Sequence, residues 1–457
     1  MMRSLYSGVS GLRIHQTKLD VIGNNIANVN TVGFKSSSVT FTDILYQTTQ
    51  AASGPNASTG TVGKNAMQIG LGATVGAISN NMSTGSSQRT DNALDLMING
   101  DAFFVVNDGS QNYFTKAGSF TVDANGTLCT STGLAVMGWL PNNDGNAIVS
   151  DTVKQLNVMS AENLYTPPEA TAKAHLTGNI DPGDSQLSTG RDVTIPIYDN
   201  IGNEYTVVLK IKEDTNATGT NDTYSVTISD IKDANGKTIK GDGTTTGFDF
   251  KLGANTQAIV SFDGTNGTFK NVKEGTTAGA DTETNSKITL NITGTPNPFS
   301  KNGIEIDFSE LTAYAVKGTS TAEGQGGGID NTGAGKSVGN MKGISVDESG
   351  KIYGSYDNGD KKLLGQISLA TFPNAAGLES VGNSLYSATM NSGEFNGIGK
   401  DITSIGGSLT SGVLEMSNVD LASEFTDLIV AQRGYQANSR IISTSDTLLE
   451  ELINLKR

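Results

Sequence analysis

Apolar residues recur every seven positions near both ends of this chain. Near the start they are Leu5, Leu12, Leu19 and Ile26. Near the end they are Leu421, Leu428, Tyr435, Ile442 and Leu449. A strict seven-residue repeat places apolar side chains in one narrow stripe along a helix, which is typical of a coiled-coil seam. The two ends are therefore predicted to form long helices that pair with each other in one inner domain.

The alternate seam positions are weak. In the first helix Gln16 and Gly23 occupy them, and in the last helix they are mostly polar or small: Glu424, Ala431, Asn438, Ser445 and Leu452. About ten stripe residues contribute roughly 15–30 kcal/mol. Ordering some seventy residues costs about 1–2 kcal/mol each, before helix hydrogen bonds offset part of that cost. We therefore expect the ends to fray in an isolated subunit and to order on self-association, with a simple intramolecular helix pair as the alternative.

The predicted first helix ends in a stretch rich in asparagine. Asparagine disfavours helix interiors because its amide competes for backbone groups, and Gly33 supplies a position where positive φ is cheap. A helix exit is predicted here, with Gly33 turning the chain outward before Phe34. The number of amides exceeds what a helix end requires. We expect them to bind a neighbouring subunit, and the candidates are Asn24, Asn25, Asn28 and Asn30.

The predicted last helix has matching signals at its two ends. Ser417, Asn418 and Asp420 are candidate caps at its start, and Lys456 and Arg457 place cations at its C-terminal end. Asn418 and Asn438 join the candidate contacts between subunits.

The region between the helices predicts two mainly-β domains. Glycine is abundant at 56 residues and charged residues make up only 17%, which favours short strands joined by tight turns. Hairpins are predicted within 96–106, 120–128 and 344–353. Pro167 and Pro168 mark a boundary. The expected segments are 1–70 (helix and extended linker), 71–168 (β domain 1), 169–336 (β domain 2, inserted), 337–412 (rest of β domain 1) and 413–457 (helix).

Composition excludes several classes of function. The net charge of −15, with no basic cluster, opposes binding to nucleic acid or anionic membrane. No apolar run approaches the ~18 residues that a membrane-spanning helix needs, and the start lacks a signal-peptide core. His15 and His175 belong to no catalytic or metal-binding motif, so no enzyme activity, metal or cofactor is expected. The single cysteine, Cys129, is predicted to be a small buried apolar residue.

Long motifs at both ends resemble a known family. Asn24–Phe34 is similar to the signature of bacterial flagellar rod and hook proteins, and Leu414–Phe425 with Ile429–Ser439 is similar to its C-terminal counterpart. Ile98–Val106 and Leu364–Phe372 resemble the first β domain of the family. An additional β domain, of about the size predicted at 169–336, is a feature of the hook members.

The resemblance implies a subunit that self-assembles into a flexible helical tube. Such a tube carries torque from the basal-body rod to the filament in motility. The implied partners are further copies of the chain, the distal rod protein, the hook cap, the hook–filament junction protein and the flagellar type III export apparatus. The implied location is the extracellular flagellum, or the periplasm in a spirochete. A distal rod protein forming a straight tube is the alternative, followed by a surface adhesin. We expect no role for Cys129 in the covalent cross-linking found in some spirochete hook proteins.

Overall fold

The structure, a computed structural model, describes residues 2–55, 60, 62–142, 147–214, 222–239, 249–275, 285–293, 299 and 303–455. The chain divides into two compact units. Unit 1 comprises 1–163, 343–354 and 361–457, and unit 2 comprises 164–342 and 355–360. The fold is multidomain, with two long helices and otherwise mainly β structure. The predicted C-terminal cations Lys456 and Arg457 lie outside the described residues.

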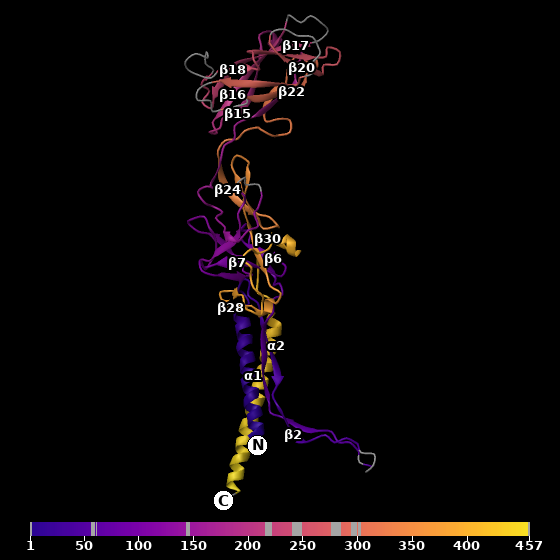
Figure 1. The fold of residues 1–457 in the computed structure, drawn as a ribbon, viewed down its shortest axis with the longest axis vertical. Helices are drawn as coiled ribbons and strands as arrows, with labels where there is room; N and C mark the ends of the chain where they lie inside the picture. The colour runs from indigo at the N-terminus through magenta and orange to yellow at the C-terminus, as the bar shows by residue number, and fades with distance from the viewer. Residues whose placement is uncertain are drawn as a thin grey trace. The chain divides into compact units, whose positions relative to one another are not determined.

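The two helices of unit 1 lie side by side (Figure 1). They are α1 (Met2–Ala27) and α2 (Leu421–Asn454). Asp420 caps α2, because its side chain accepts a hydrogen bond from the Ala422 backbone nitrogen at 2.9 Å. The start of α2 is therefore fixed by one of the three predicted capping residues.

The segment that follows α1 forms strands, whereas an extended linker was predicted. β1 (Ser37–Asp43) pairs with β4 (Ala73–Asn80), and β2 (Tyr46–Gln50) pairs with β3 (Met67–Gly70). β1 and β4 contact α1. The alternating Thr and apolar residues of this segment fit a pleated strand, which explains why it contains apolar side chains that a free linker would not need.

The β core of unit 1 is built around a sheet in the order β26-β11-β7-β8-β29-β28. Its aromatic centre places the Phe114 and Phe372 rings 4.7 Å apart, edge to face. Two pairs of strands lie outside this sheet, Ser87–Arg89 with Val413–Glu415 and Leu96–Asn99 with Ser408–Ser411. The bounds of the sheet strands are β7 (Ala102–Asn107), β8 (Asn112–Thr115), β11 (Ala135–Trp139), β26 (Lys361–Ile367), β28 (Glu379–Gly382) and β29 (Leu385–Ser387). The attached or separately paired strands are β5 (Ser87–Arg89), β6 (Leu96–Asn99), β9 (Phe120–Val122), β10 (Leu128–Thr130), β12 (Lys154–Gln155), β27 (Leu369–Thr371), β30 (Ser408–Ser411) and β31 (Val413–Glu415).

Two of the hairpin predictions in this unit can be compared with the pairing. The hairpin within 120–128 is confirmed, because β9 pairs with β10. The hairpin at Asn99-Gly100 is wrong. β6 pairs with β30 and β7 pairs with β8, so the turn joins strands that belong to different sheets. Cys129 is only partly buried, and its sulfur lies 3.6 Å from the Thr121 hydroxyl, in contrast to the buried position expected.

Unit 2 contains two five-stranded sheets that share one apolar core. Their orders are β18-β21-β22-β14-β23 and β15-β16-β17-β19-β20. Apolar residues alternate along several of these strands, and β15 (Arg191–Tyr198) and β16 (Glu204–Glu213) pair through the turn at 199–203. The glycine-rich segment 317–340 contains β23 (Glu323–Gly326), which pairs with β14.

The remaining strands and short helices have the following bounds. In unit 2 they are β13 (Tyr165–Thr166), β14 (Lys173–Asn179), η1 (Ser185–Ser188), β15 (Arg191–Tyr198), β16 (Glu204–Glu213), β17 (Asp222–Asp233), β18 (Asp249–Leu252), β19 (Gln257–Phe262), β20 (Phe269–Glu274), β21 (Lys287–Thr293), β22 (Ile304–Thr312) and β23 (Glu323–Gly326). β24 (Gly339–Val346) and β25 (Lys351–Tyr356) carry the chain from one unit to the other, and η2 (Ala375–Gly377) and η3 (Thr403–Ile405) lie in unit 1.

Candidate assembly site

Much of the contact between α1 and α2 is formed by small and polar residues. A Cβ atom added to Gly11 would lie 2.7 Å from the side-chain amide of Asn438, and one added to Gly434 would lie 2.5 Å from Cε1 of His15. Ala431 is fully buried in this contact. Glycine and alanine allow the two backbones to approach closely, so this face is specified by shape more than by apolar area.

Polar pairs extend the contact between α1 and α2 toward the β core. We call the row of residues through which the two helices touch the contact line. Lys18 Nζ lies 3.0 Å from Asp427 Oδ1, and Asn25 Nδ2 donates a hydrogen bond to Glu424 Oε1 at 2.9 Å. The Lys18–Asp427 pair is partly exposed and contributes only about 0–1 kcal/mol. Along α1 the contact residues recur at intervals of three and four: Gly8, Gly11, His15, Lys18, Ile22 and Asn25.

The predicted apolar stripes lie beside this contact line. Leu421 and Tyr435 are each 40% exposed. The remaining stripe residues are partly buried: Leu5, Leu12, Leu19, Ile26, Leu428, Ile442 and Leu449. The weak companion positions Glu424, Ala431, Asn438 and Ser445 face α1 instead. The stripe residue Ile442 also reaches α1, since a Cβ atom on Gly8 would lie 3.3 Å from its Cγ1. The contact between α1 and α2 therefore combines small and polar residues with part of the predicted stripe.

Several large apolar side chains of α2 are exposed. Phe425 is 51% exposed and Ile429 is 56% exposed. Val430, Ile441 and Leu448 are also exposed but lie on another side of the helix, and Ile441 is next to Gly8 of α1. Exposed apolar groups that lie together on one element mark interaction surfaces. The face of α2 that carries Phe425 and Ile429 is the first part of the candidate assembly site.

The exit from α1 forms the second part of the site. α1 ends at Ala27, and Gly33 has φ +67°. A Cβ atom on Gly33 would lie 2.6 Å from the backbone nitrogen of Ala117, so both the conformation and the close approach require glycine. The Gly33 backbone nitrogen donates to the Glu415 carbonyl oxygen at 2.8 Å. The predicted helix exit and the turning role of Gly33 are thus present in the structure.

The amides of this exit have partners within the chain. Asn25 is 1% exposed; its side chain accepts from the Ser37 backbone nitrogen at 3.0 Å and donates to the Ser37 carbonyl oxygen at 2.9 Å. Asn28 donates to the side chain of Asn24 at 3.0 Å. The assignment of Asn25 to a contact between subunits is therefore corrected, because its hydrogen bonds are satisfied internally. Asn24 and Asn30 are exposed.

The C-terminal candidate amides also bind their own chain. Asn418 accepts a hydrogen bond from the Ser36 backbone nitrogen at 2.8 Å and donates to the Asn81 carbonyl oxygen at 2.8 Å. Asn438 donates to the Gly434 carbonyl oxygen at 3.0 Å, within α2. Asn418 therefore fastens the start of α2 to the strands that follow α1.

A buried ion pair, which the sequence did not reveal, joins the two motif regions. Lys35 Nζ lies 2.5 Å from Glu415 Oε1 and donates to the Ser83 carbonyl oxygen at 2.7 Å. Both side chains have no exposed surface. The Gly85 backbone nitrogen donates to the same carboxylate oxygen at 2.9 Å. The signal available in the sequence was that Lys35 directly follows the first motif and Glu415 lies near the start of the second.

Lys116 lies close to this ion pair. Its Nζ donates to the Gly100 carbonyl oxygen at 2.7 Å and lies 5.3 Å from the centre of the Phe103 ring. Burial lowers the pKa of Lys116, and the nearby Glu415 carboxylate partly opposes this shift. Gly33 packs against the backbone of this lysine. The segment that leaves α1 therefore packs on the β core beside the buried charges of Lys35, Lys116 and Glu415.

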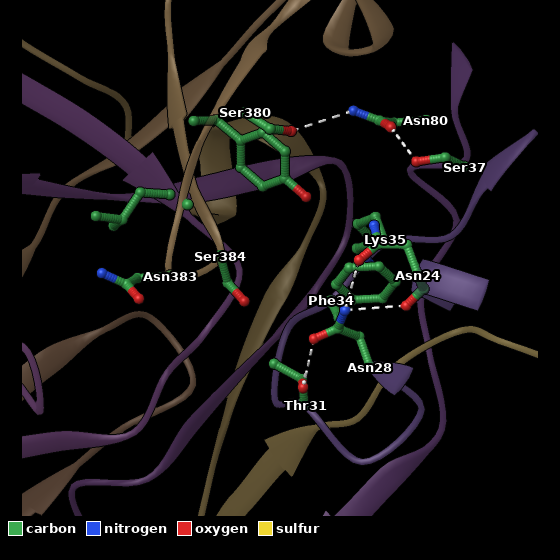
Figure 2. Close-up of a pocket in the computed structure, with 13 residues that line it drawn as sticks. Asn24, Asn28, Thr31, Phe34, Lys35, Ser37, Asn80, Ser380, Asn383 and Ser384 are labelled. Carbon is green, nitrogen blue, oxygen red and sulfur yellow. Dashed lines mark hydrogen bonds between the residues drawn. The ribbon is translucent and has the colours of Figure 1, made fainter. Parts of the chain in front are cut away.

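A polar pocket of about 540 Å³ opens beside the exit from α1 (Figure 2). Asn24 and Asn28 line one side and Asn383 and Ser384 lie opposite. Asn383 and Ser384 have φ of +53° and +57°, in the turn between β28 and β29. The Ser384 hydroxyl donates to the Val32 carbonyl oxygen at 3.2 Å, which ties this left-handed turn to the exit loop.

The described residues contain no group of three His, Cys, Asp or Glu that could hold a metal ion. Within the same residues, neither helix is long and apolar enough to cross a membrane.

Four family models match the chain. "Flagella basal body rod protein" matches residues 5–35, and "Flagellar hook protein FlgE/F/G D1 domain" matches 97–166. "Flagellar basal body protein FlaE D2 domain" matches 163–327, and "Flagellar basal body rod FlgEFG protein C-terminal" matches 410–455. The first and last matches include the exit from α1 and the whole face of α2. These matches define the class as the axial proteins of the bacterial flagellum, which include rod and hook proteins.

Full-length relatives narrow the class. The flagellar hook protein FlgE of Treponema pallidum is 34% identical over 490 residues, with 100% of both chains covered. That of Borreliella burgdorferi is 34% identical over 476 residues, again with 100% of both chains covered. The flagellar basal-body rod protein FlgG of Bacillus subtilis is 30% identical over 457 residues and 100% of both chains. The chain belongs to the flagellar hook protein family, and it is a structural subunit of the hook.

Proposed function

We propose that copies of the chain assemble through α1 and α2 into the inner wall of a flexible helical tube. The helix pair forms a coiled-coil-like inner domain, and the tube acts as a universal joint that carries torque from rod to filament. The observation that supports this most strongly is the division of α2 into two faces. One face is small and polar and fits α1, and the other carries exposed apolar side chains such as Phe425 and Ile429.

The two faces differ in what they can stabilise. A contact lined by glycine, alanine and amides removes little apolar area from water, and each exposed Phe or Ile would contribute about 1.5–3 kcal/mol if a neighbour covered it. The helix pair therefore gains more from a second copy than from its own internal contact. The apolar stripe from Leu5 to Ile26 and from Leu421 to Leu449 borders this uncovered face. It remains our proposed contact between subunits, together with Asn24, Asn28 and Asn30.

The same proposal assigns roles to the inserted β domain and to the partner proteins. Residues 169–336 form a β domain inserted into a loop of the first, and subunits slide at these outer domains while the helices hold. The partners are further copies of the chain, the distal rod protein, the hook cap and the hook–filament junction protein. Export proceeds through the flagellar type III apparatus, and the assembled protein lies outside the cytoplasm.

A double substitution tests the uncovered face of α2. Phe425→Ser with Ile429→Ser should abolish polymers, because two half-exposed apolar anchors are lost where neighbours meet. The β core should stay folded, as reported by fluorescence of the single tryptophan, Trp139, which is buried in unit 1. The control is Ile201→Ser, which removes a side chain that is 66% exposed in unit 2. Normal polymers from the double variant, by electron microscopy, would refute the assignment of this face.

The second candidate function is that of a distal rod protein, favoured by the rod relative that matches over its full length. A rod is straight and stiff, whereas a hook curves. Electron microscopy of polymer from the purified protein separates the two, since straight tubes under all conditions would support the rod.

A further inference from the structure

His15 occupies the contact line between α1 and α2. A Cβ atom on Gly434 would lie 2.5 Å from Cε1 and 2.6 Å from Nε2 of the imidazole, so the ring fills the space that a side chain at position 434 would take. Phe41 of β1 covers the ring from another side, with the ring centroids 6.4 Å apart. The imidazole is thus a packing element at the centre of the helix pair.

The ring has no hydrogen-bond partner for its buried nitrogen. Nδ1 of His15 is buried and makes no hydrogen bond with any described residue. A neutral imidazole tolerates this, because one of its two nitrogens carries no proton. In the charged form both nitrogens carry protons, and a buried unpaired charge is costly. Burial lowers the pKa of His15, and the positive charge of Lys18 lowers it further.

The charged groups around His15 would not stabilise its protonated form. On α1 the nearby charge is Lys18, and on α2 the Asp427 carboxylate is already bound by Lys18 at 3.0 Å, while Arg433 directly precedes Gly434. On β1, Asp43 is hydrogen-bonded to Tyr46. β4, which also contacts α1, contains no ionisable side chain. A proton added to His15 therefore meets positive charge or occupied carboxylates.

We infer that His15 makes the contact between α1 and α2 sensitive to pH. In its neutral form the ring packs against Gly434 and holds α1 to α2. Protonation expels the ring into water and loosens the contact from Gly8 to Lys18. The separated helices bind the proton at the ordinary pKa of about 6.5, and the packed pair binds it only at lower pH. Stability of the pair is therefore full above about pH 6.5 and falls as the pH decreases toward the packed-state pKa.

Two measurements on the full chain test this inference. The pKa of His15 is measured by NMR of ¹³C-labelled histidine, and the His15→Gln spectrum separates its signal from that of His175, the only other histidine. Pulsed hydrogen exchange with mass spectrometry then follows peptides from residues 8–22 and 427–445 between pH 7.5 and 5. Wild type and His15→Gln are labelled at the same pH, so the intrinsic exchange rate cancels. We expect a pKa below 6.5, and protection that falls in wild type by about tenfold per unit of pKa depression, but not in His15→Gln.

The matched control is His175→Gln, which replaces a buried histidine of unit 2 and should keep the wild-type pH dependence. Gly434→Ala provides a second variant, because its methyl group displaces the ring and should return the pKa of His15 toward 6.5. This measurement decides the question even if His15→Gln disrupts the helix pair at pH 7.5. A wild-type His15 pKa at or above 6.5, no change in Gly434→Ala, or equal acid sensitivity in a folded His15→Gln would each overturn the inference.

Discussion

Single side chains hold the two ends of the chain together where the helices meet the β core. Asn25 binds Glu424, and Lys35 binds Glu415, across sequence separations of 399 and 380 residues. Asn418 adds a bond to the strands after α1. These contacts form in the isolated subunit, so they orient the helices before any neighbour arrives. The junction is therefore predicted to be sensitive to single substitutions.

The buried ion pair gives the first prediction. Lys35→Met leaves the Glu415 carboxylate buried without its cation, which should cost about 3–5 kcal/mol in the unfolding free energy of unit 1. Adding Glu415→Gln should recover part of this loss, because glutamine can still accept from the Gly85 nitrogen and carries no charge. The measurement is a urea titration followed by Trp139 fluorescence. A double variant as unstable as Lys35→Met would contradict this view of the pair.

Gly33 gives the second prediction, with Gly406 as its control. Both have positive φ, +67° and +73°, so alanine at either site should cost about 1–2 kcal/mol. A Cβ atom on Gly33 would also lie 2.6 Å from Ala117 N, whereas one on Gly406 has no atom within 4 Å. Gly33→Ala should therefore destabilise unit 1 by clearly more than Gly406→Ala, in the same urea titration. Equal losses would show that the close approach is unimportant.

The helices and strands show which parts of the fold could be predicted from sequence patterns. The seven-residue repeats correctly predicted both helices, because periodicity reports which faces are apolar. They did not reveal the close contacts at Gly11 and Gly434, because glycine contributes shape and not hydrophobicity. The hairpin at Asn99-Gly100 failed for a different reason. A local turn signal carries no information about β30, the partner of β6, which comes about three hundred residues later.

The hairpin of β2 and β3 gives the third prediction. Every residue of both strands is exposed, and an isolated two-stranded hairpin is at best marginally stable in water. Its backbone amides should exchange quickly in the subunit and become protected in the polymer. The β9–β10 hairpin, which includes the buried Phe120 and Leu128, serves as the control and should be protected in both states. Strong protection of β2 and β3 in the isolated subunit would contradict the prediction.

The chain as a whole combines two units with different sequence signals. Unit 2 could be anticipated strand by strand, because its apolar residues alternate and meet in one core. The predicted limits at 169 and 336 differ from 164 and 342, because β13 pairs with the start of β24 and extends the unit. Lys35, Lys116 and Glu415 could not be anticipated together, since their proximity depends on the complete fold of unit 1.

The proposal for the whole molecule is that α1 and α2 are completed by neighbouring copies. Cryo-electron microscopy of polymer grown from the purified subunit tests it most directly. We expect a curved tube whose inner wall is made of α1 and α2, with Phe425 and Ile429 buried against another subunit and the contact between Gly11 and Asn438 retained. A polymer in which these helices face the outside, or in which Phe425 and Ile429 stay exposed, would contradict it.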